Sequence, residues 1–337
     1  MKRRIVANIA ACGSLVCALS FWLHAQTLPT KKDAEAILQN ASEGADLWAS
    51  DSVPFHLLAS VHYELGGQPS DGTYDLLWQS PDQYREYFEM RTAKEMEIAS
   101  GGKLSILRNT PTLTVPLWST RSHLRFIRNY FLRQKVRRVR TVQVNGMEAT
   151  CVDSESAYAE RQDCFDSSTN QAVSVSFVEK LPYGPNSVWG KTELSSFTSL
   201  GKKRYPLRIM AKELDEKLDV TITTFEQPGP ISEDLFVSPA DAQVFDWCPN
   251  PTTSGHREFP PGAVGRMDAP GGNFPYYVLV GRDGHVKKSA PMRSAGSVVD
   301  HKMATWLQMA KFPVQSCGGT PVEYETVMVA PLEIRLR

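Results

Sequence analysis

The middle of this chain is a long succession of short segments in which polar and apolar residues alternate, separated by tight turns. In the first pair, Phe55 to Leu65 and Thr73 to Gln79 flank a turn at 66–72 that is rich in glycine. Similar segments follow at 84–90, 95–99, 104–108, 136–144, 149–152, 162–165, 173–177, 191–200, 204–210 and 218–225. Because strands joined by tight turns run in opposite directions, this pattern predicts one large antiparallel sheet.

Two segments have the periodicity of helices instead. Thr30 to Ala49 carries apolar residues at the spacing of one helix face, and so does Trp118 to Gln134. We therefore predict an α+β chain in which residues 26–240 form a strongly curved antiparallel sheet, or half-barrel, with two or three helices.

The C-terminal part has a different pattern. Six of the prolines fall between Pro249 and Pro275, so residues 226–275 are predicted to be extended and irregular, with a domain boundary near Asp241. Strands are then predicted at 276–280 and 285–289, a helix at 297–311 and one or two closing strands at 322–336. Residues 241–337 are thus expected to hold a small β-β-α-β domain.

The first residues have the pattern of a secretory signal peptide. Lys2, Arg3 and Arg4 precede the apolar run from Ile5 to Leu23, and Ala25 is the small residue at the expected cleavage position. Cleavage there would give a periplasmic or secreted protein. The alternative is a retained inner-membrane anchor through residues 5–23, because a run of this length nearly spans a bilayer.

The charge balance argues against a nucleic-acid partner. The 337 residues include 37 basic and 37 acidic side chains, and three of the basic ones lie within residues 1–25. The chain that remains after cleavage is therefore mildly acidic, whereas binding to nucleic acid requires a broad cationic surface.

Four cysteines lie beyond the predicted signal peptide, and they allow three pairings. Cys151 and Cys164 lie in neighbouring strand segments, which favours a bond between them, and Cys248 would then bond to Cys317. Such bonds form in an oxidising compartment. The alternative is metal ligation, but no Cys-x-x-Cys occurs and no histidine lies at paired ligand spacing, so we expect no metal site.

Several motifs follow one another in the C-terminal region. They are Phe259-Pro260-Pro261-x-Ala263, Tyr277-x-Leu279-x-Gly281-Arg282-Asp283-Gly284-x-Val286, Ser294-Ala295-Gly296-Ser297-x-x-Asp300-x-x-x-Ala304, Lys311-Phe312-Pro313 and Gly319-Thr320-Pro321-Val322. In this order and spacing, residues 255–337 resemble the TonB C-terminal domain. The sequence departs from that family at Met309-Ala310-Lys311-Phe312, where Trp-Arg-Phe is usual. A predicted folded domain also replaces the family's long proline- and lysine-rich spacer.

The TonB resemblance implies a module that recognises an extended segment of another envelope protein, such as an outer-membrane receptor. Such recognition adds a strand to a free sheet edge. The candidate edges are 276–280 and 322–336, and the second presents Val322, Tyr324, Thr326 and Met328.

The N-terminal region has a second resemblance. Gly201-x-x-x-Tyr205-Pro206-x-x-Ile209, Val220-Thr221-Ile222 and Ile231-Ser232-x-x-Leu235-Phe236-x-x-Pro239 follow the long run of strands. In this respect residues 30–240 resemble the LolA/LppX-type lipoprotein carriers. That resemblance implies a half-barrel whose apolar concave face holds a lipid or acyl chain under a helical lid.

The sequence lacks the common motifs of hydrolases and nucleotide-binding enzymes. Gly-x-Ser-x-Gly, His-Glu-x-x-His and the phosphate-binding Gly-x-x-x-x-Gly-Lys-Ser/Thr are all absent from the sequence. The acidic groups Glu95/Glu97 and Asp215/Glu216/Asp219 are expected to be solvated in polar turns. We therefore expect no catalytic residue and no cofactor.

A basic stretch occupies residues 121–140, where eight arginines and lysines occur without an acidic residue. Arg121, Arg125, Arg128 and Arg133 could form a patch that docks on anionic lipid headgroups or an acidic partner. The alternative, which we favour, is a lid helix whose arginines are solvated or pair with acidic residues of the sheet.

The leading hypothesis from the sequence is a non-enzymatic protein of the cell envelope that recognises a partner through a TonB-like module, in a role linked to envelope transport. The second hypothesis is a periplasmic carrier of a lipid or lipoprotein, which would use the N-terminal half-barrel.

Overall fold

A computed structural model describes residues 31–125, 135–155, 159–179, 188–259 and 272–332. The predicted signal peptide lies outside these residues. None of the helices described is long and apolar enough to cross a membrane.

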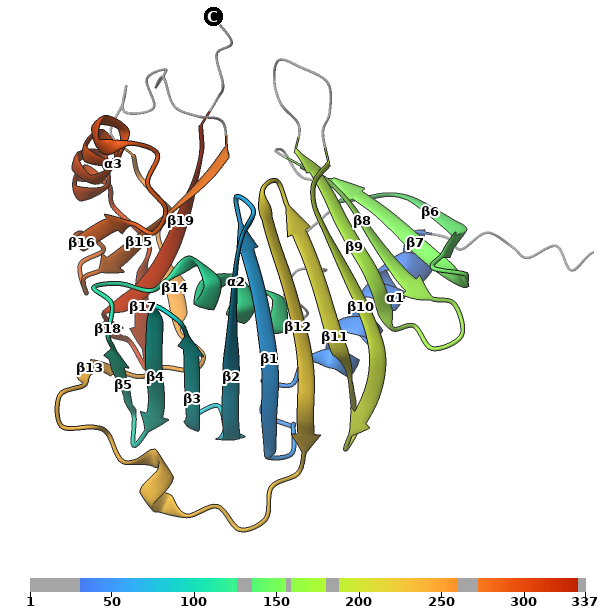
Figure 1. Cartoon of the computed structure of the whole chain (residues 1–337), viewed down its shortest axis with the longest axis horizontal. Helices are drawn as coiled ribbons and strands as arrows, with labels where there is room; N and C mark the ends of the chain where they lie inside the picture. Colours follow the sequence, from blue (N-terminus) through green and yellow to red (C-terminus); the bar gives the residue numbers. More distant parts are fainter. Residues whose placement is uncertain (1–30, 126–134, 156–158, 180–187, 260–271, 333–337) are drawn as a thin grey trace, which may run out of the picture.

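One antiparallel sheet of 13 strands dominates the fold, as the alternation predicts, and it is open and strongly curved (Figure 1). Its strands are β1 (Phe55–Leu65), β2 (Gln68–Ser80), β3 (Gln83–Met90), β4 (Ala93–Ser100), β5 (Lys103–Arg108), β6 (Lys135–Val144), β7 (Met147–Glu155), β8 (Ala159–Asp166), β9 (Ala172–Glu179), β10 (Val188–Leu200), β11 (Lys203–Glu213), β12 (Glu216–Glu226) and β13 (Gln243–Asp246).

The sheet consists of two meanders joined at its centre. The first runs outward from β1 to β5, and the second begins at the opposite edge with β6 and returns to β12. β12 then pairs with β1 along nearly its whole length. The chain must therefore cross the sheet between β5 and β6, and the helix α2 (Val115–Leu124) lies on this crossing.

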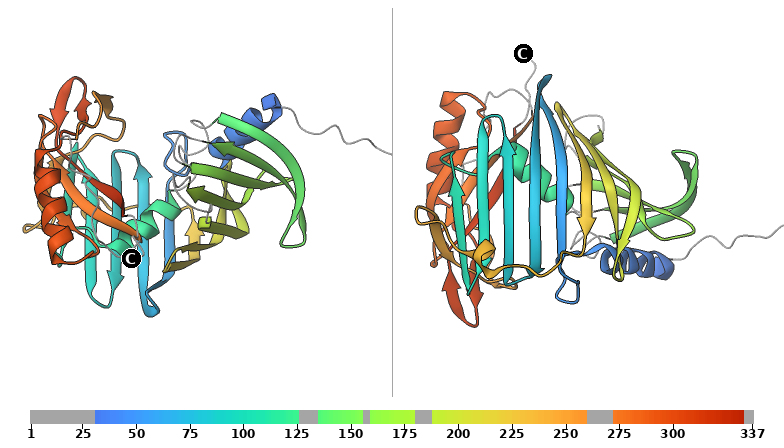
Figure 2. Two further views of the ribbon diagram at one scale, coloured as in Figure 1. Left: turned by 90° about the horizontal axis from the view of Figure 1, so that it is seen from above. Right: turned by 60° about the horizontal axis from the view of Figure 1, so that its bottom comes forward.

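Two helices cover the concave face of the sheet, which Figure 2 shows from above. α1 (Lys31–Ala45) contributes Ala34 and Leu38 to the main hydrophobic core. The large rings of Tyr74 and Trp78, on β2, belong to the same core. α2 begins with a proline in its first turn, where the missing N–H leaves no hydrogen bond unmade. Its last carbonyl, that of Leu124, accepts a hydrogen bond from the buried Tyr205 hydroxyl.

The C-terminal part has the predicted order of strand, strand, helix and strand. These are β15 (Gly272–Val280), β16 (Val286–Pro291), α3 (Ser297–Met309) and β19 (Tyr324–Leu332), with the short β17 (Val314–Cys317) and β18 (Thr320–Val322) between the last two. The sheet order is β16-β15-β19, so residues 276–280 lie in a central strand. The expectation that they form a free edge is therefore wrong.

Residues 226–275 are less irregular than predicted. They include the short helix η2 (Glu233–Phe236), β13, β14 (Thr252–Ser254) and the start of β15. β13 pairs with β5 in the large sheet, although it follows the predicted boundary near Asp241. Four-residue and three-residue strands give too short an alternation to be detected from sequence.

The C-terminal elements lie against the same side of the large sheet as α2. Arg108 on β5 binds Glu325 on β19 through two hydrogen bonds of 3.1 and 2.9 Å. Arg293, which follows β16, binds Asp215 in the β11–β12 turn through two more, of 2.9 and 2.6 Å. Tyr277 and Leu279 of β15 belong to the main hydrophobic core, so both parts of the chain share one apolar interior.

Both predicted disulfides are present. Cys151 and Cys164 face each other on β7 and β8, and the Cys248–Cys317 bond joins the segment after β13 to β17. The second bond therefore links the large sheet's outer edge to the C-terminal elements.

Replacing Cys248 and Cys317 together by serine is expected to lower the free energy of unfolding by about 4 kcal/mol, because a long loop gains more entropy when it is released. The residues are 69 positions apart. The matched change at Cys151 and Cys164, which are 13 apart, is expected to cost about 3 kcal/mol. Urea unfolding without reductant measures both, and the reverse order would contradict this explanation.

Candidate functional site

The concave face carries a buried cluster of charges where α2 crosses β3 and β4. Glu86 on β3 lies directly opposite Glu97 on β4, and Glu95 lies two residues before Glu97 on the same face. All three side chains are almost completely buried, at 1%, 4% and 6% exposure. Carboxylates placed this closely in an apolar interior repel one another, so they need cations in direct contact.

Arginines supply that contact. Arg121 on α2 binds all three carboxylates: Glu86, Glu95 at 3.1 Å and Glu97 at 2.9 Å. Arg125, one helical turn later, binds Glu86 at 3.0 Å, and Arg108 on β5 binds Glu95 at 2.8 Å. We call these six residues the Glu–Arg cluster.

The cluster shifts the pKa values of Glu95 and Glu97 in opposite directions. Burial by itself would raise the pKa of Glu97, but Arg121, Arg125 and the Tyr84 hydroxyl, 2.5 Å away, hold that pKa below its usual value. The pKa of Glu95 is raised, because burial outweighs the attraction of Arg121 and Arg108. These residues are locked into one another, and their arrangement fixes α2 across the sheet.

Two cavities of about 380 Å³ each flank α2, and both fall within the range of roughly 300–1,000 Å³ typical of ligand sites. Trp118 lines both of them. One, which we call the β12 cavity, lies between α2 and strands β8 to β12; the other, the β19 cavity, lies between α2, β5 and β19.

The β12 cavity is the more apolar of the two. Its walls include Val115 and Trp118 of α2, Val175 and Phe177 of β9, and Pro275 and Val329 of the C-terminal strands. The Phe177 ring lies over Gly190 of β10, where a Cβ atom would come within 2.6 Å of it. Glycine at 190 therefore gives this ring its place in the cavity wall.

The polar end of the β12 cavity includes His123, Glu213 and Glu216. Burial lowers the pKa of His123, whose Nδ1 lies 2.8 Å from the Ser119 carbonyl oxygen. Burial raises the pKa of Glu213. It raises that of Glu216 as well, against the opposing effect of the Ser119 hydroxyl.

Leu214 stands at the mouth of the same cavity. It is 45% exposed and has a φ of 51°, a left-handed conformation that a leucine adopts only at a cost of about 1 kcal/mol. The bond from Arg293 to the neighbouring Asp215 holds this turn against the C-terminal part of the chain.

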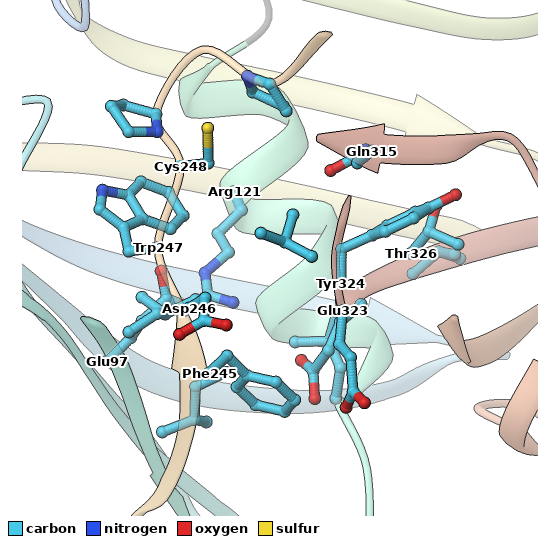
Figure 3. Close-up of a pocket in the computed structure, with 18 of the residues that line it drawn as sticks. Glu97, Arg121, Phe245, Asp246, Trp247, Cys248, Gln315, Glu323, Tyr324 and Thr326 are labelled. Carbon is cyan, nitrogen blue, oxygen red and sulfur yellow. The ribbon is translucent and has the colours of Figure 1, made fainter. Parts of the chain in front are cut away.

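The β19 cavity follows an edge strand, and Figure 3 shows Trp247 and Tyr324 on its opposite sides. Four consecutive residues of β19, 324–327, line it, together with Val322 and Glu323 just before the strand. In a strand, successive side chains point to opposite faces, so a cavity lined by all four runs along the strand's edge. Among the described residues, β19 pairs only with β15, on its other side.

The structure places the sequence-predicted site residues in three ways. Arg121 and Arg125 pair with the sheet's acids, as the favoured interpretation has it, whereas Arg128 and Arg133 lie outside the described residues. Val322 and Met328 are buried, at 5% and 6% exposure, and Val322 contributes to the wall of the β19 cavity. Tyr324 and Thr326 line the β19 cavity.

The expectation that Glu95 and Glu97 are solvated is wrong. The alternation in β4 places Met96 and Ile98 on the face opposite the glutamates, and Ile98 is itself buried there, at 3% exposure. η2 contacts β3 and β4. The sequence pattern alone predicts that only one face of these strands is buried. The sequence signal for the cluster is the basic stretch that begins at Arg121 of α2 and contains no acidic residue.

No protein-family model matches the sequence, and no curated protein matches it. Among solved structures, a LolA superfamily protein from Nitrosomonas europaea aligns with 61% of this chain and 97% of its own, at 11% identity and a TM-score of 0.38. A putative outer-membrane lipoprotein-sorting protein domain from Vibrio parahaemolyticus aligns with 61% of this chain and 96% of its own, at 9% identity and a TM-score of 0.42. A DUF1329 family protein from Desulfovibrio piger aligns with 63% of this chain and 98% of its own, at 9% identity and a TM-score of 0.44.

These structures include the class that the N-terminal strand pattern resembles, and the TonB resemblance finds no support among them. With TM-scores below 0.5 they define neither the family nor the ligand of this chain.

Replacing Arg121 by methionine is expected to lower the free energy of unfolding by about 3–5 kcal/mol, because three buried carboxylates lose their shared cation. The loss should be smaller at pH 5 than at pH 8, since a carboxyl without its cation has a raised pKa and accepts a proton. Thermal or urea unfolding measures both effects.

The matched control is Arg137→Met. Arg137 also pairs with a glutamate, Glu155, but its side chain is 55% exposed, and such surface pairs contribute about 1 kcal/mol or less. Equal losses in the two variants would show that the Glu–Arg cluster does not hold α2.

Proposed function

We propose that this chain is a non-enzymatic carrier of an amphiphile, whose apolar chain is bound in the β12 cavity on the concave face of the large sheet. The predicted signal peptide and the two disulfides favour a periplasmic or secreted location for it. The observation that carries the proposal is the cavity itself. It is largely apolar, of ligand size, and walled by α2, by strands of the large sheet and by the C-terminal strands.

Two features support a bound chain over an accidental gap. Protein interiors are close-packed, and this cavity leaves the apolar side chains of Val115, Val175 and Val329 without packing partners on one side. Two positions in the wall also have special backbone or packing requirements. Glycine at 190 leaves room for the Phe177 ring, and Leu214 at the mouth has a left-handed backbone conformation. Strain of this kind collects at functional sites.

Protein purified from its native host is expected to release an amphiphile on solvent extraction, detected by mass spectrometry. Val175→Trp should abolish this, because the larger ring occupies the cavity from β9. Val244→Trp is the matched control, since Val244 is 53% exposed on β13 and the protein should keep its ligand. Undiminished ligand in Val175→Trp, or none in the unaltered protein, would refute the proposal.

A second candidate function is recognition of an extended protein segment at the free edge of β19. The observation that favours it is the β19 cavity, which follows this edge over residues 324–327 and faces it with the aromatic rings of Trp118, Phe245 and Trp247. An added strand would find backbone partners on one side and apolar surface on the other.

A photo-crosslinking residue at Thr326 is expected to capture one extended segment of one envelope protein in the native host. A synthetic peptide of that segment should then slow hydrogen exchange of alternate amides in 324–329, because they gain acceptors. The same crosslinker at Val298, 66% exposed on α3, should not capture it. Equal capture at both positions, or unchanged exchange, would exclude strand addition.

A further inference from the structure

The polar end of the β12 cavity is a set of hydrogen-bond acceptors contributed by two elements. His123 lies on α2, and Glu213 and Glu216 stand on either side of the β11–β12 turn. All three line the cavity.

The hydrogen-bonding role of His123 follows from its partner. A backbone carbonyl can only accept, so Nδ1, 2.8 Å from the Ser119 oxygen, carries the ring's proton. The imidazole is buried, with 9% exposure, and its lowered pKa keeps it neutral. Nε2 therefore has a free lone pair. It lies 3.7 Å from Glu213 Oε1, too far for a hydrogen bond.

Neither glutamate has a cation of its own. In the described part of the chain, Glu213 and Glu216 form no ion pair with a lysine or arginine. The two arginines that line the cavity form their ion pairs with other residues: Arg293 with Asp215 at 2.6 Å, and Arg161 with Asp163 at 2.7 Å. Arg293 attracts Glu216 as well, but without an ion-pair contact. The nearby hydroxyls of Ser119 and Tyr63 interact with Glu216 but not with Glu213.

Three acceptors at the end of an apolar cavity match one head group well. A primary ammonium has three N–H donors and the opposite charge to the carboxylates, whereas a hydroxyl has one donor and a carboxylate none. Charge-assisted hydrogen bonds of this kind are about twice as strong as neutral ones.

We propose that the β12 cavity selects amphiphiles with a primary ammonium head group, held by His123 Nε2 and the carboxylates of Glu213 and Glu216. This inference rests on the carrier function proposed above and adds the chemistry of the head group.

Four single-chain probes separate head-group chemistry from chain binding. They are decylammonium, decyltrimethylammonium, decanol and decanoate, titrated below their micelle concentrations into the delipidated protein by calorimetry. Decylammonium is expected to bind at least tenfold more tightly than each of the others. The trimethyl probe has the same charge but no N–H donor, so it isolates the hydrogen bonds.

The pH dependence tests the site without a substitution. The groups around it are His123 of α2, Tyr63 of β1, Asp163 and Arg161 of β8, Glu213, Asp215 and Glu216 of the β11–β12 hairpin, and Arg293 after β16. A raised carboxyl pKa means that protonation competes with the ammonium. Decylammonium should therefore bind more weakly as the pH falls from 7.5 to 5, while decanol binding stays constant.

Variants complete the test. Glu213→Gln and Glu216→Gln should each reduce decylammonium affinity at least fivefold and leave decanol affinity unchanged. Glu193→Gln is the control, because Glu193 pairs with Lys191 and does not line the cavity. Equal binding of all four probes would overturn the head-group inference and leave the carrier function standing. Binding of none would overturn both.

Discussion

The contact on which this structure depends is that of Arg121 with three buried carboxylates. Glu86, Glu95 and Glu97 would repel one another on adjacent strands, and a single guanidinium from α2 joins them. Because each charge is buried, the pairing tolerates little displacement, and the helix is held across the sheet at one position. The same helix then divides the concave face, so the position of Arg121 determines the shape of both cavities.

The C-terminal elements complete what α2 begins. Pro275, Val329 and Arg293 close one side of the β12 cavity, and β19 forms a wall of the other. They are held there by Arg108–Glu325 and Arg293–Asp215, and by the Cys248–Cys317 bond near β13. Arg108 is also a member of the Glu–Arg cluster. The C-terminal segment therefore forms part of the wall of both cavities, and neither cavity is formed by the large sheet and α2 alone.

The sequence predicts the part of this fold that repeats. Strands β1 to β12 alternate over enough residues to be recognised, and the paired cysteines follow from their places on neighbouring strands. What it does not reveal is which face of a strand is buried. Glu95 and Glu97 alternate with Met96 and Ile98, and both faces are covered, one by α2 and the other by the η2 segment. The periodicity of a sequence shows which residues are polar, but here the polar residues Glu95 and Glu97 are themselves buried.

The candidate site at Glu213 and Glu216 could not be predicted either, because the sequence does not show which polar residues face the interior. Glu213 and Glu216 flank a hairpin turn in a segment rich in charged residues, so only the three-dimensional placement of His123 and Val175 opposite them shows that they face a cavity. Asp219, three residues further, pairs with Arg208 and remains an ordinary surface residue, as the sequence interpretation of this group assumed.

Two sets of glutamates thus lie on the concave side of one sheet, on either side of one helix, and they differ in exposure and in their cations. Glu86, Glu95 and Glu97 are buried and have arginines in contact. Glu213 and Glu216 are half-buried at the end of the β12 cavity, beside a neutral histidine and an Arg293 that binds Asp215. Burying a carboxylate without a cation is costly, and this chain shows that it can supply one where the fold requires it. The missing cation beside Glu213 and Glu216 is then best understood as the part of the site that a ligand brings.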